Sequence, residues 1–433
     1  MKNTIMIMLA VTWVLTACVV RPQADRTLKF RISGDTLMQA VKSMARETVK
    51  SGFTAGDSYG EVWIRDYNTF ITLASTLHPP ETTKENLRIF FRLQGEDGNI
   101  VDGFIPKAQA TDSKIGYAYV HTPLEPAYAG HKNTVETDQE SSLVQAVYKY
   151  VVKNGDQAFL QDSIGGQTVA QRLERAMDFL MEKRYNPEYG LLWGATTADW
   201  GDVQPEHPWG VYLTDSTHYA IDIYDNAMFL IALDNLMELL PETEAKWTSI
   251  REQIAANCMK HLWDADRQKF RPHIYLNGSP FSQDFDEEEI YYHGGTAMAI
   301  EAGLLSETQV KHALDRMVAN VRASGAATIG LTLYPTYPAG SFMNEGMHPY
   351  GYQNGGDWDW FGSRMIQQLI RYGFVAEAYE HVQPMLRRAV DNNGFYEWYT
   401  VDNQPKGSGT FRGAAGVLYD AIVLFEEFAT ENR

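Results

Sequence analysis

Glu397 is the carboxylic acid of this sequence with the most unusual neighbours. It lies between Tyr396 and Trp398, and the chain after it is rich in glycine. A solvated surface glutamate is the simpler interpretation, but two aromatic neighbours are uncommon for one. A carboxylate held in such a place can take a proton from a reacting group. Glu397 is therefore our first candidate for acid–base chemistry.

Two further acids share one short turn. Asp199 and Asp202 lie on either side of Trp200-Gly201. A carboxyl group beside indole in an apolar loop has a raised pKa, which suits a general acid. This argument favours Asp199 slightly, because it directly precedes Trp200. The sequence leaves both aspartates open.

Trp63, Arg65 and Asp66 combine three kinds of contact at the start of a predicted helix. The guanidinium donates hydrogen bonds in a fixed fork, the carboxylate accepts them, and the indole offers a flat stacking face. Such a group suits vicinal hydroxyls. A buried ion pair at a helix N-terminus has the same pattern and is the alternative.

Asp357 and Asp359 flank Trp358, and Trp360 follows. The two acids suit hydroxyl ligands, and either tryptophan suits a stacking platform. We expect one of the two tryptophans to belong to the core instead.

Other motifs favour plain structural roles. His293, in a Gly-rich loop, is a single histidine, and the acidic run from Asp284 to Glu289 has no calcium-loop spacing, so we interpret it as solvated. Nothing resembles a zinc site, a phosphate-binding loop, a dinucleotide fingerprint or a nucleophile elbow. We predict an enzyme without cofactor or metal.

The composition narrows the class of partner. Ten Trp and 24 Tyr exceed what a core needs, and such rings stack on sugars or on bases. The net charge of −18 excludes a phosphate backbone as partner, since binding one needs a basic surface. A carbohydrate is the partner that remains.

Helical periodicity begins after the first thirty residues and persists to the end. Some segments are apolar on all sides, as inner helices are, and others alternate charged and apolar residues, as outer helices do. Short links join neighbours, whereas the long connections carry Gly, Trp, Asp and His. This pattern predicts an all-α fold of six helical hairpins in a closed double ring, with small β-hairpins in its loops, such as one over 269–275. The twelve predicted helices are 35–50, 66–78, 81–94, 137–153, 168–183, 217–240, 243–262, 295–304, 307–323, 357–373, 375–390 and 412–430.

The N-terminus predicts export. Lys2 precedes an apolar run that is too short to span a bilayer and is typical of a secretory signal. Leu15-Thr16-Ala17-Cys18 resembles the lipobox of bacterial lipoproteins, which implies a lipid anchor at Cys18. An ordinary signal peptide is the alternative. We expect a signal over 1–17, a polar tether over 18–32 and one catalytic domain over 33–433, held as a monomer at the outer membrane and facing the periplasm or the cell surface.

Several motifs in order resemble the six-hairpin glycosidases of the glucoamylase-like and glycogen-debranching-like families. They are Trp63-Ile64-Arg65-Asp66, the segment from Thr197 to Asp202, the segment from Gln353 to Trp360, and Gly394 to Trp398 followed by Phe411 to Gly416. The resemblance implies an (α/α)6 barrel that spans nearly the whole mature chain. One departure is that the glucoamylase pattern has paired glutamates where this chain has aspartates.

The resemblance also implies roles for residues. Glu397 would be the general base, and Asp199 or Asp202 the general acid, of a glycoside hydrolase that inverts the anomeric centre at non-reducing chain ends, with α-linked sugars as the expected substrates. Asp138 would line the sugar pocket and is the reserve candidate for the acid, although an acid at a helix start is more often a cap. The substrate would contact Trp63, Arg65, Asp66, Asp138, Trp200, Asp357, Trp358 and Trp398.

Three other functions stay open. A phosphorylase on the same barrel would need basic or hydroxyl donors near the base, and Arg412 and Lys406 are candidates. A lyase or epimerase would depend on His and Tyr. A glycan-binding lipoprotein without chemistry would need no pair of acids facing one pocket.

Overall fold

The computed structural model describes residues 21–431 apart from 112–117 and 210. Within this part of the chain, six helices form an inner ring. Each packs against the next in sequence, and the last packs against the first, so the ring closes. The inner helices are α3 (Ile64–Leu77), α5 (Gln139–Asn154), α7 (Ile223–Leu239), α9 (His293–Glu301), α11 (Asp359–Arg371) and α13 (Arg412–Thr430).

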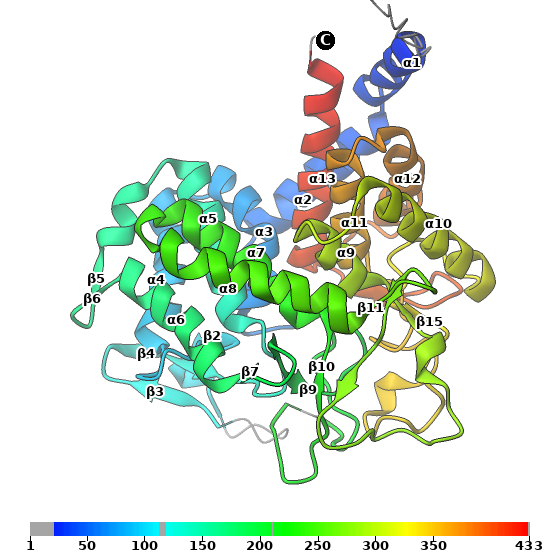
Figure 1. The fold of residues 1–433 in the computed structure, drawn as a ribbon. Coiled ribbons are helices and arrows are strands. Elements are labelled where there is room, and N and C mark those ends of the chain that lie inside the picture. The colour runs from blue at the N-terminus through cyan, green and yellow to red at the C-terminus, as the bar shows by residue number, and fades with distance from the viewer. Residues whose placement is uncertain (1–20, 112–117, 210, 432–433) are drawn as a thin grey trace, which may run out of the picture.

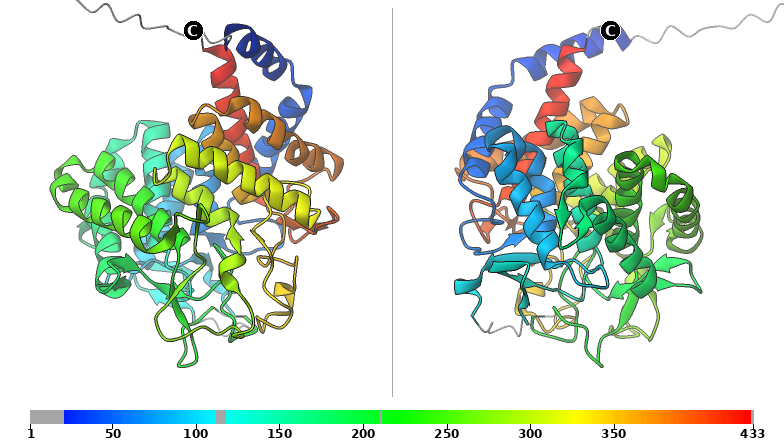
Figure 2. Two further views of the ribbon diagram at one scale, coloured as in Figure 1. Left: turned by 45° about the vertical axis from the view of Figure 1, so that its right-hand side comes forward. Right: turned by 90° about the vertical axis from the view of Figure 1, so that its left-hand side faces the viewer.

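Six further helices surround the ring (Figures 1 and 2). They are amphipathic, because only one face of each touches the ring: α2 buries Met38, Val41, Ala45 and Val49 at helical spacing. Capping boxes at Thr168 and Ser306 fix the starts of two of them. The outer helices are α2 (Thr36–Lys50), α4 (Pro80–Leu93), α6 (Val169–Lys183), α8 (Glu244–Asn257), α10 (Glu307–Ser324) and α12 (Val375–Asp391).

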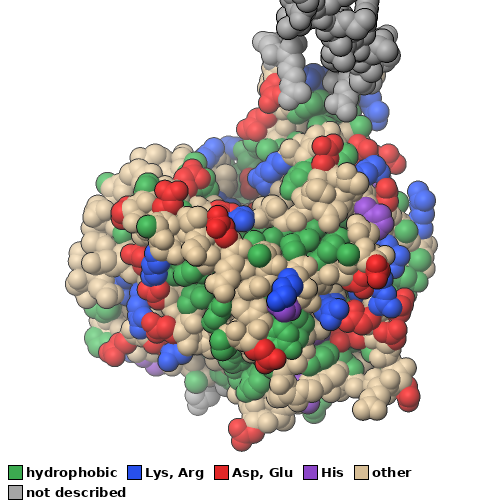
Figure 3. All heavy atoms as spheres, in the orientation of Figure 1, with side chains coloured by type: hydrophobic (Ala, Val, Ile, Leu, Met, Phe, Trp, Pro, Cys, Tyr) green, Lys and Arg blue, Asp and Glu red, His purple; other side chains and the backbone are tan. Residues whose placement is uncertain are grey.

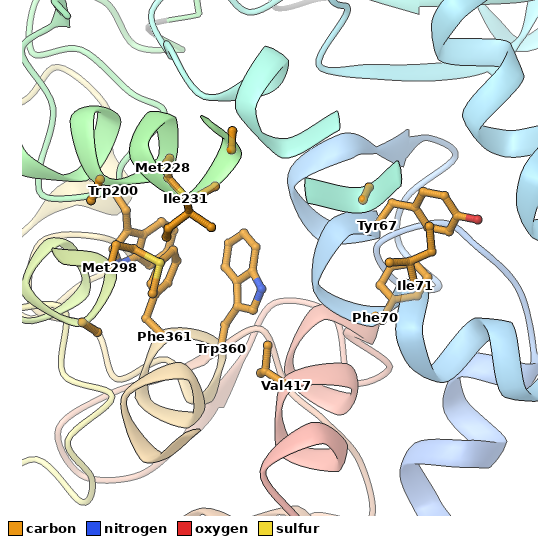
Figure 4. Close-up of a cluster of buried hydrophobic side chains, with 14 of the residues drawn as sticks. Tyr67, Phe70, Ile71, Trp200, Met228, Ile231, Met298, Trp360, Phe361 and Val417 are labelled. Carbon is orange, nitrogen blue, oxygen red and sulfur yellow. The ribbon is translucent and has the colours of Figure 1, made fainter. Parts of the chain in front are cut away.

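The core fills the space between the inner helices. Figure 4 shows side chains from several of them pointing toward one another, with the loop residue Trp200 among them. Trp200 stacks on Phe361 of α11 at 4.4 Å between ring centroids. The early part of α7, from Ile223 to Leu233, is buried on all sides, as its sequence predicts.

The connections differ in length at the two ends of the barrel. Chain reversals after α3, α7, α9 and α11 are short, whereas every inner helix is preceded by a connection of at least 13 residues. All inner helices therefore begin at one end, and the long loops gather there. This is the lower end in Figure 1.

Small antiparallel sheets brace these loops, and a ribbon over 163–168 lies instead between α5 and α6, at the other end of the barrel. The largest has the order β1-β2-β4-β3 and pairs Val62 with Phe104 and Gly103 with His131. Its strands are β1 (Val62–Trp63), β2 (Gly103–Pro106), β3 (Val120–Thr122) and β4 (Glu125–His131). A second sheet joins β9 (Gly194–Ala195), β10 (Tyr219–Ile221) and β13 (Ile274–Tyr275).

The other strands form two-stranded ribbons. These are β5 (Ser163–Ile164) with β6 (Gln167–Thr168), β7 (Tyr185–Asn186) with β8 (Leu191–Leu192), β11 (Trp263–Asp264) with β12 (Lys269–Phe270), β14 (Tyr291–Tyr292) with β15 (Leu333–Tyr334), and β16 (Trp398–Tyr399) with β17 (Pro405–Lys406).

The predicted all-α fold of six hairpins is confirmed, and each of the twelve predicted helices has a counterpart. Boundaries differ where tertiary pairing overrides local periodicity. The helix predicted over 217–240 begins at Ile223, because 219–221 pairs as β10 and Asp222 caps the helix. The helix predicted over 243–262 is α-helical only to Asn257 and ends in a π-helical turn.

The prediction of a polar tether over 18–32 is corrected for the described part of that range. Helix α1 (Arg21–Ser33) lies there and packs against α13. Ile32 is buried, and Lys29 lies over the ring of Phe428 and donates to the carbonyl of Glu431. The polar composition of this segment gave no sign of a helix, because the residues that α1 contacts lie at the C-terminal end of the chain.

The predicted signal segment and Cys18 lie outside the described residues. Among the helices that the structure describes, none has the length and apolar character needed to cross a bilayer. On the face drawn in Figure 3, Lys and Arg lie among Asp and Glu and form no continuous basic area.

Candidate active site

A cavity of about 600 Å³ opens at the end of the barrel where the inner helices begin. Its lining combines aromatic rings with carboxyl groups. The rings belong to Tyr59, Trp63, Tyr119, Trp200, Trp209, Tyr352, Trp358, Trp360, Trp398 and Phe411, and the carboxyl groups to Glu61, Asp66, Asp102, Glu136, Asp202 and Glu397. Apolar walls with a few convergent polar groups are typical of a small-molecule site.

Glu397 lines this cavity from the loop between α12 and α13. It is 6% exposed, and its Oε2 accepts hydrogen bonds from the Tyr59 hydroxyl at 2.8 Å and from the Ser408 amide at 3.3 Å. Burial raises the pKa of Glu397, opposed by the Tyr59 hydrogen bond, and the charge of Asp202 raises it further. Gly407 has φ +70°, and a Cβ there would lie 2.3 Å from Oε2, so the return strand needs glycine.

The structure separates Asp199 from Asp202. Asp202 lines the cavity, where its Oδ1 accepts a hydrogen bond from the Gln353 side chain at 2.8 Å. Asp199 is absent from the lining, and its two oxygens accept the amides of Gly294 and Gly295 at 2.7 Å each. Asp199 therefore holds the start of α9.

The preference for Asp199 as the acid is corrected on this evidence. Asp199 is buried, and burial raises its pKa as predicted. However, the turn closed by the Gly201 amide and the Ala198 carbonyl at 3.0 Å directs the two aspartates to different partners. The raised pKa of Asp199 shows that its carboxyl group is buried, but a buried group need not face the cavity.

Arg65 and Asp66 both line the cavity, but their roles differ. Arg65 gives Nε and Nη2 to the two oxygens of Asp138, at 2.7 and 3.2 Å, and also pairs with Glu136 at 3.1 Å. Its Nη1 donates to the Trp200 carbonyl. Nε, Nη1 and Nη2 of Arg65 thus all have partners within the protein.

Asp66 is the freer of the two. Burial raises its pKa to about 8, against the opposing charge of Arg65 and with the help of Glu397 and Asp202. Its Oδ1 is buried and has no hydrogen-bond partner among the described residues.

Asp138 and Asp357 lie outside the cavity lining, against the prediction that they bind substrate. Asp138 is fully buried between Arg65 and the Tyr224 hydroxyl, 2.7 Å away. Asp357 accepts from Arg388 at 2.8 Å, and Asp359 accepts from the same guanidinium at 2.6 Å. These acids satisfy buried arginines.

The predicted aromatic contacts are brought together. Trp63, Trp200, Trp358 and Trp398 all line the cavity. Trp360 also reaches it, whereas the sequence predicts that only one of Trp358 and Trp360 does. Both are nearly buried and pack around Trp200, so they belong to the core and the cavity floor at once.

Sequence reasoning missed one side of the site. Asp102, Glu61 and His131 line the cavity from the four-stranded sheet and its approach. Burial raises the pKa of Asp102 to about 7, while His131 and Lys132 lower it. The position of these residues in the long connections before α3 and α5 was the available signal, but only strand pairing brings Asp102 next to the first hairpin.

His293 is structural, as predicted, whereas the acidic run is not solvated throughout. The His293 ring lies against the Ile329 carbonyl and the Asn320 side chain, and burial lowers its pKa to about 4. Within the acidic run, Glu287 accepts from Tyr275 and Tyr337. Across the described residues, no cluster of three His, Cys, Asp or Glu side chains is arranged to hold a metal ion.

A closed double ring of helices, with a cavity at its loop end that holds carboxyl groups among aromatic rings, defines an (α/α)6-barrel enzyme that acts on glycosides. The model of the glycosyl hydrolase 94 superfamily catalytic domain matches residues 14–357. The chain belongs to that superfamily. A search of curated proteins gives no match.

Solved structures share the fold at low identity. A GH63 mannosylglycerate hydrolase from Thermus thermophilus, in complex with Tris and D-glycerate, has a TM-score of 0.61 at 16% identity, over 88% of this chain and 99% of that one. A rhamnosidase from Klebsiella oxytoca with rhamnose bound has a TM-score of 0.58 at 12% identity, over 89% and 63%.

Proposed function

We propose that the protein is an inverting, exo-acting glycoside hydrolase, with Glu397 as general base and Asp202 as general acid. The observation that carries this proposal is that both carboxyl groups face one cavity from different loops, 196–222 and 392–411, while Asp199 and Asp138 are tied to the scaffold. Hydrolysis requires one proton donor at the leaving oxygen and one carboxylate that activates water or attacks the sugar.

The local environments support this division of roles. Glu397 accepts two hydrogen bonds, which favour its charged form, as a base requires, and which act against the burial that raises its pKa. The carboxyl group of Asp202 accepts one hydrogen bond from the described residues, from the Gln353 side-chain amide to Oδ1, which leaves it available to the leaving oxygen. For an inverting enzyme, which places a water between base and sugar, we expect the two carboxyl groups to lie roughly 6.5–9.5 Å apart.

Inversion is tested by the anomer first released. A screen of α- and β-linked disaccharides and oligosaccharides, followed by ¹H NMR, should give a sugar of the anomeric form opposite to that of the substrate. Release of the same anomer would contradict inversion, and the absence of turnover on every glycoside would contradict the proposed function as a whole.

Exo action is suggested by residues deep in the barrel's loop end. Asp66 and Trp360 lie in the first turns of α3 and α11, and both line the cavity together with the loop residue Trp200, so we expect them to hold a terminal sugar. Asp66 alone, and not the Arg65-Asp66 pair, makes the terminal contact, because Arg65 is occupied by Asp138. Early digestion of a long oligosaccharide should yield a monosaccharide or disaccharide, whereas mid-length fragments would indicate an open cleft.

Phosphorolysis is the second candidate, and the charges oppose it. Its candidate donors Arg412 and Lys406 are absent from the cavity lining. Arg412 instead donates to Thr54 and Ser51. Among the described lining residues the basic ones are Arg65, already paired with two acids, and His131. Adding inorganic phosphate should therefore leave the rate unchanged and form no sugar phosphate.

The predicted lipid anchor remains a proposal about Cys18. Helix α1 and the C-terminus lie at the end of the molecule opposite the long loops (Figure 1). An anchor just before α1 would therefore direct the cavity away from the membrane. Cys18→Ser should move the protein from the membrane fraction to the soluble fraction without changing its turnover.

A further inference from the structure

The cavity holds more carboxyl groups than hydrolysis needs. Six carboxyl groups line it, against one arginine and one histidine among the described residues. The Arg65 guanidinium already faces Glu136 at 3.1 Å and Asp138 at 2.7 Å. A neutral sugar would leave this imbalance in place, and an anionic one would increase it.

Four of these carboxyl groups have no assigned role as acid or base. Glu136 pairs with Arg65 and Glu61 with His131, and the other two are Asp66 and Asp102. Asp66 is 9% exposed and Asp102 is 6% exposed, and both face the cavity. The Oδ1 atom of each is buried without a hydrogen-bond partner in the described structure. A buried polar atom without a partner costs free energy, so a ligand that pairs with it is favoured.

The surroundings of these two oxygens are acidic. The charges of Glu397 and Asp202 disfavour ionisation of Asp66, and that of Asp202 disfavours ionisation of Asp102. His131 partly offsets the charge near Asp102, but it also lies 3.4 Å from Glu61. A donor that carries positive charge would satisfy both orphan oxygens and offset the repulsion among the four acids.

We infer that this cavity selects a sugar bearing a protonated amine, a non-acetylated amino sugar, and that Asp66 and Asp102 are its specificity-determining residues. This inference rests on the proposed function, because it names the substrate class of the same site. A glycoside with a carboxylate is disfavoured, since no described lining residue offers it an uncommitted arginine or lysine.

The first test measures binding without turnover. Isothermal titration at pH 7 and low salt compares Tris with 1,1,1-tris(hydroxymethyl)ethane, which has the same three hydroxymethyl arms and a methyl group in place of the ammonium. Tris should bind at least about tenfold more tightly, as expected for a close charge pair in a buried site. Equal affinities would overturn the inference.

Variants locate the charge that is responsible. Asp102→Asn and Asp66→Asn should each reduce the Tris preference several-fold and leave the affinity for the neutral analogue nearly unchanged. Asp315→Asn, on the exposed side of α10, is the matched control and should change neither. A preference that persists in the double variant Asp66→Asn/Asp102→Asn would assign Tris binding to Asp202 and Glu397 and overturn the inference.

The second test uses turnover. For whichever glycoside is hydrolysed, kcat/KM is compared with that of its amino-deoxy form, and the amine should be the better substrate by about tenfold or more. Inverting hydrolysis of neutral glycosides with no advantage for the amine would overturn the inference and leave the proposed function standing. Selective Tris binding without hydrolysis of any glycoside would overturn the proposed function and leave the selectivity of the cavity for an amine standing.

Discussion

Two groups of aspartates and glutamates lie within the same barrel and have opposite environments. In the scaffold group, Asp138, Asp357 and Asp359 are paired with buried arginines, and Asp199 caps α9 through two backbone amides. In the cavity group, Asp66, Asp102, Asp202 and Glu397 form no ion pair with an arginine among the described residues. Besides burial, the charge of Asp202 raises the pKa of the other three. The comparison shows that chemistry is available only where a carboxyl group is left incompletely paired.

The largest expected effect lies in the cavity group. Glu397→Gln changes charge but hardly shape, so kcat should fall by several powers of ten while sugar binding and melting temperature stay nearly unchanged. Steady-state kinetics with a thermal melt checks both. Turnover close to that of the parent enzyme would remove Glu397 as the base.

The next effect compares the two aspartates of one turn. Asp202→Asn should lower kcat by roughly 10²–10⁴-fold, the usual value of a general acid, and by less on aryl glycosides, whose leaving groups need little protonation. Asp199→Asn should instead lose about 1–3 kcal/mol of stability, because an amide nitrogen cannot accept from Gly294 or Gly295.

Denaturant unfolding and steady-state kinetics, measured on both aspartate variants, test whether the roles of Asp199 and Asp202 are assigned correctly. If Asp199→Asn lost turnover at unchanged stability and Asp202→Asn kept turnover, the division between scaffold and cavity would be reversed.

A third effect breaks the scaffold group alone. Arg388→Met removes the cation shared by Asp357 and Asp359, and leaving buried acids without a partner costs about 3–5 kcal/mol. The midpoint of urea unfolding should fall accordingly. Folded protein should retain its kcat, and an unchanged midpoint would show that the ion triad does not stabilise the barrel.

The last effect is a change with pH, and it comes from Asp66. Its pKa of about 8 lies above the ordinary value of 3.8, so between these two values the unfolded chain releases a proton that the native state keeps. Native stability therefore falls as pH rises, by up to about 1.4 kcal/mol per pH unit. Asp66→Asn abolishes this contribution.

The melting temperature of Asp66→Asn relative to the parent should accordingly increase from pH 5 to pH 8 and level off above, the range set by the pKa of about 8. Asp102 titrates in both proteins and cancels in the difference. Parallel melting curves across this range would show that Asp66 is ionised in the native cavity.

The sequence by itself determined the barrel. Apolar periodicity distinguished inner helices such as α7 from outer ones such as α8, and loop length placed the site at one end, because both are local properties of the chain. It also predicted Glu397, Asp66 and four of the cavity tryptophans, which lie in compact motifs. Contacts between distant segments were hidden, so the sequence predicts a tether where α1 lies, although the partners of α1 are on α12 and α13.

Only the tertiary structure decided which acids face the cavity. Asp199 and Asp202 belong to the same short turn, and what separates them is that α9 presents two amides to Asp199 and none to Asp202. Asp138 does not line the cavity because Arg65 binds it, and Asp102 lines the cavity because the strand after it pairs with β4. In both cases the contact joins residues that are far apart in sequence. A carboxyl group is free to react only if no donor elsewhere in the chain has already bound it, and that depends on the packed fold.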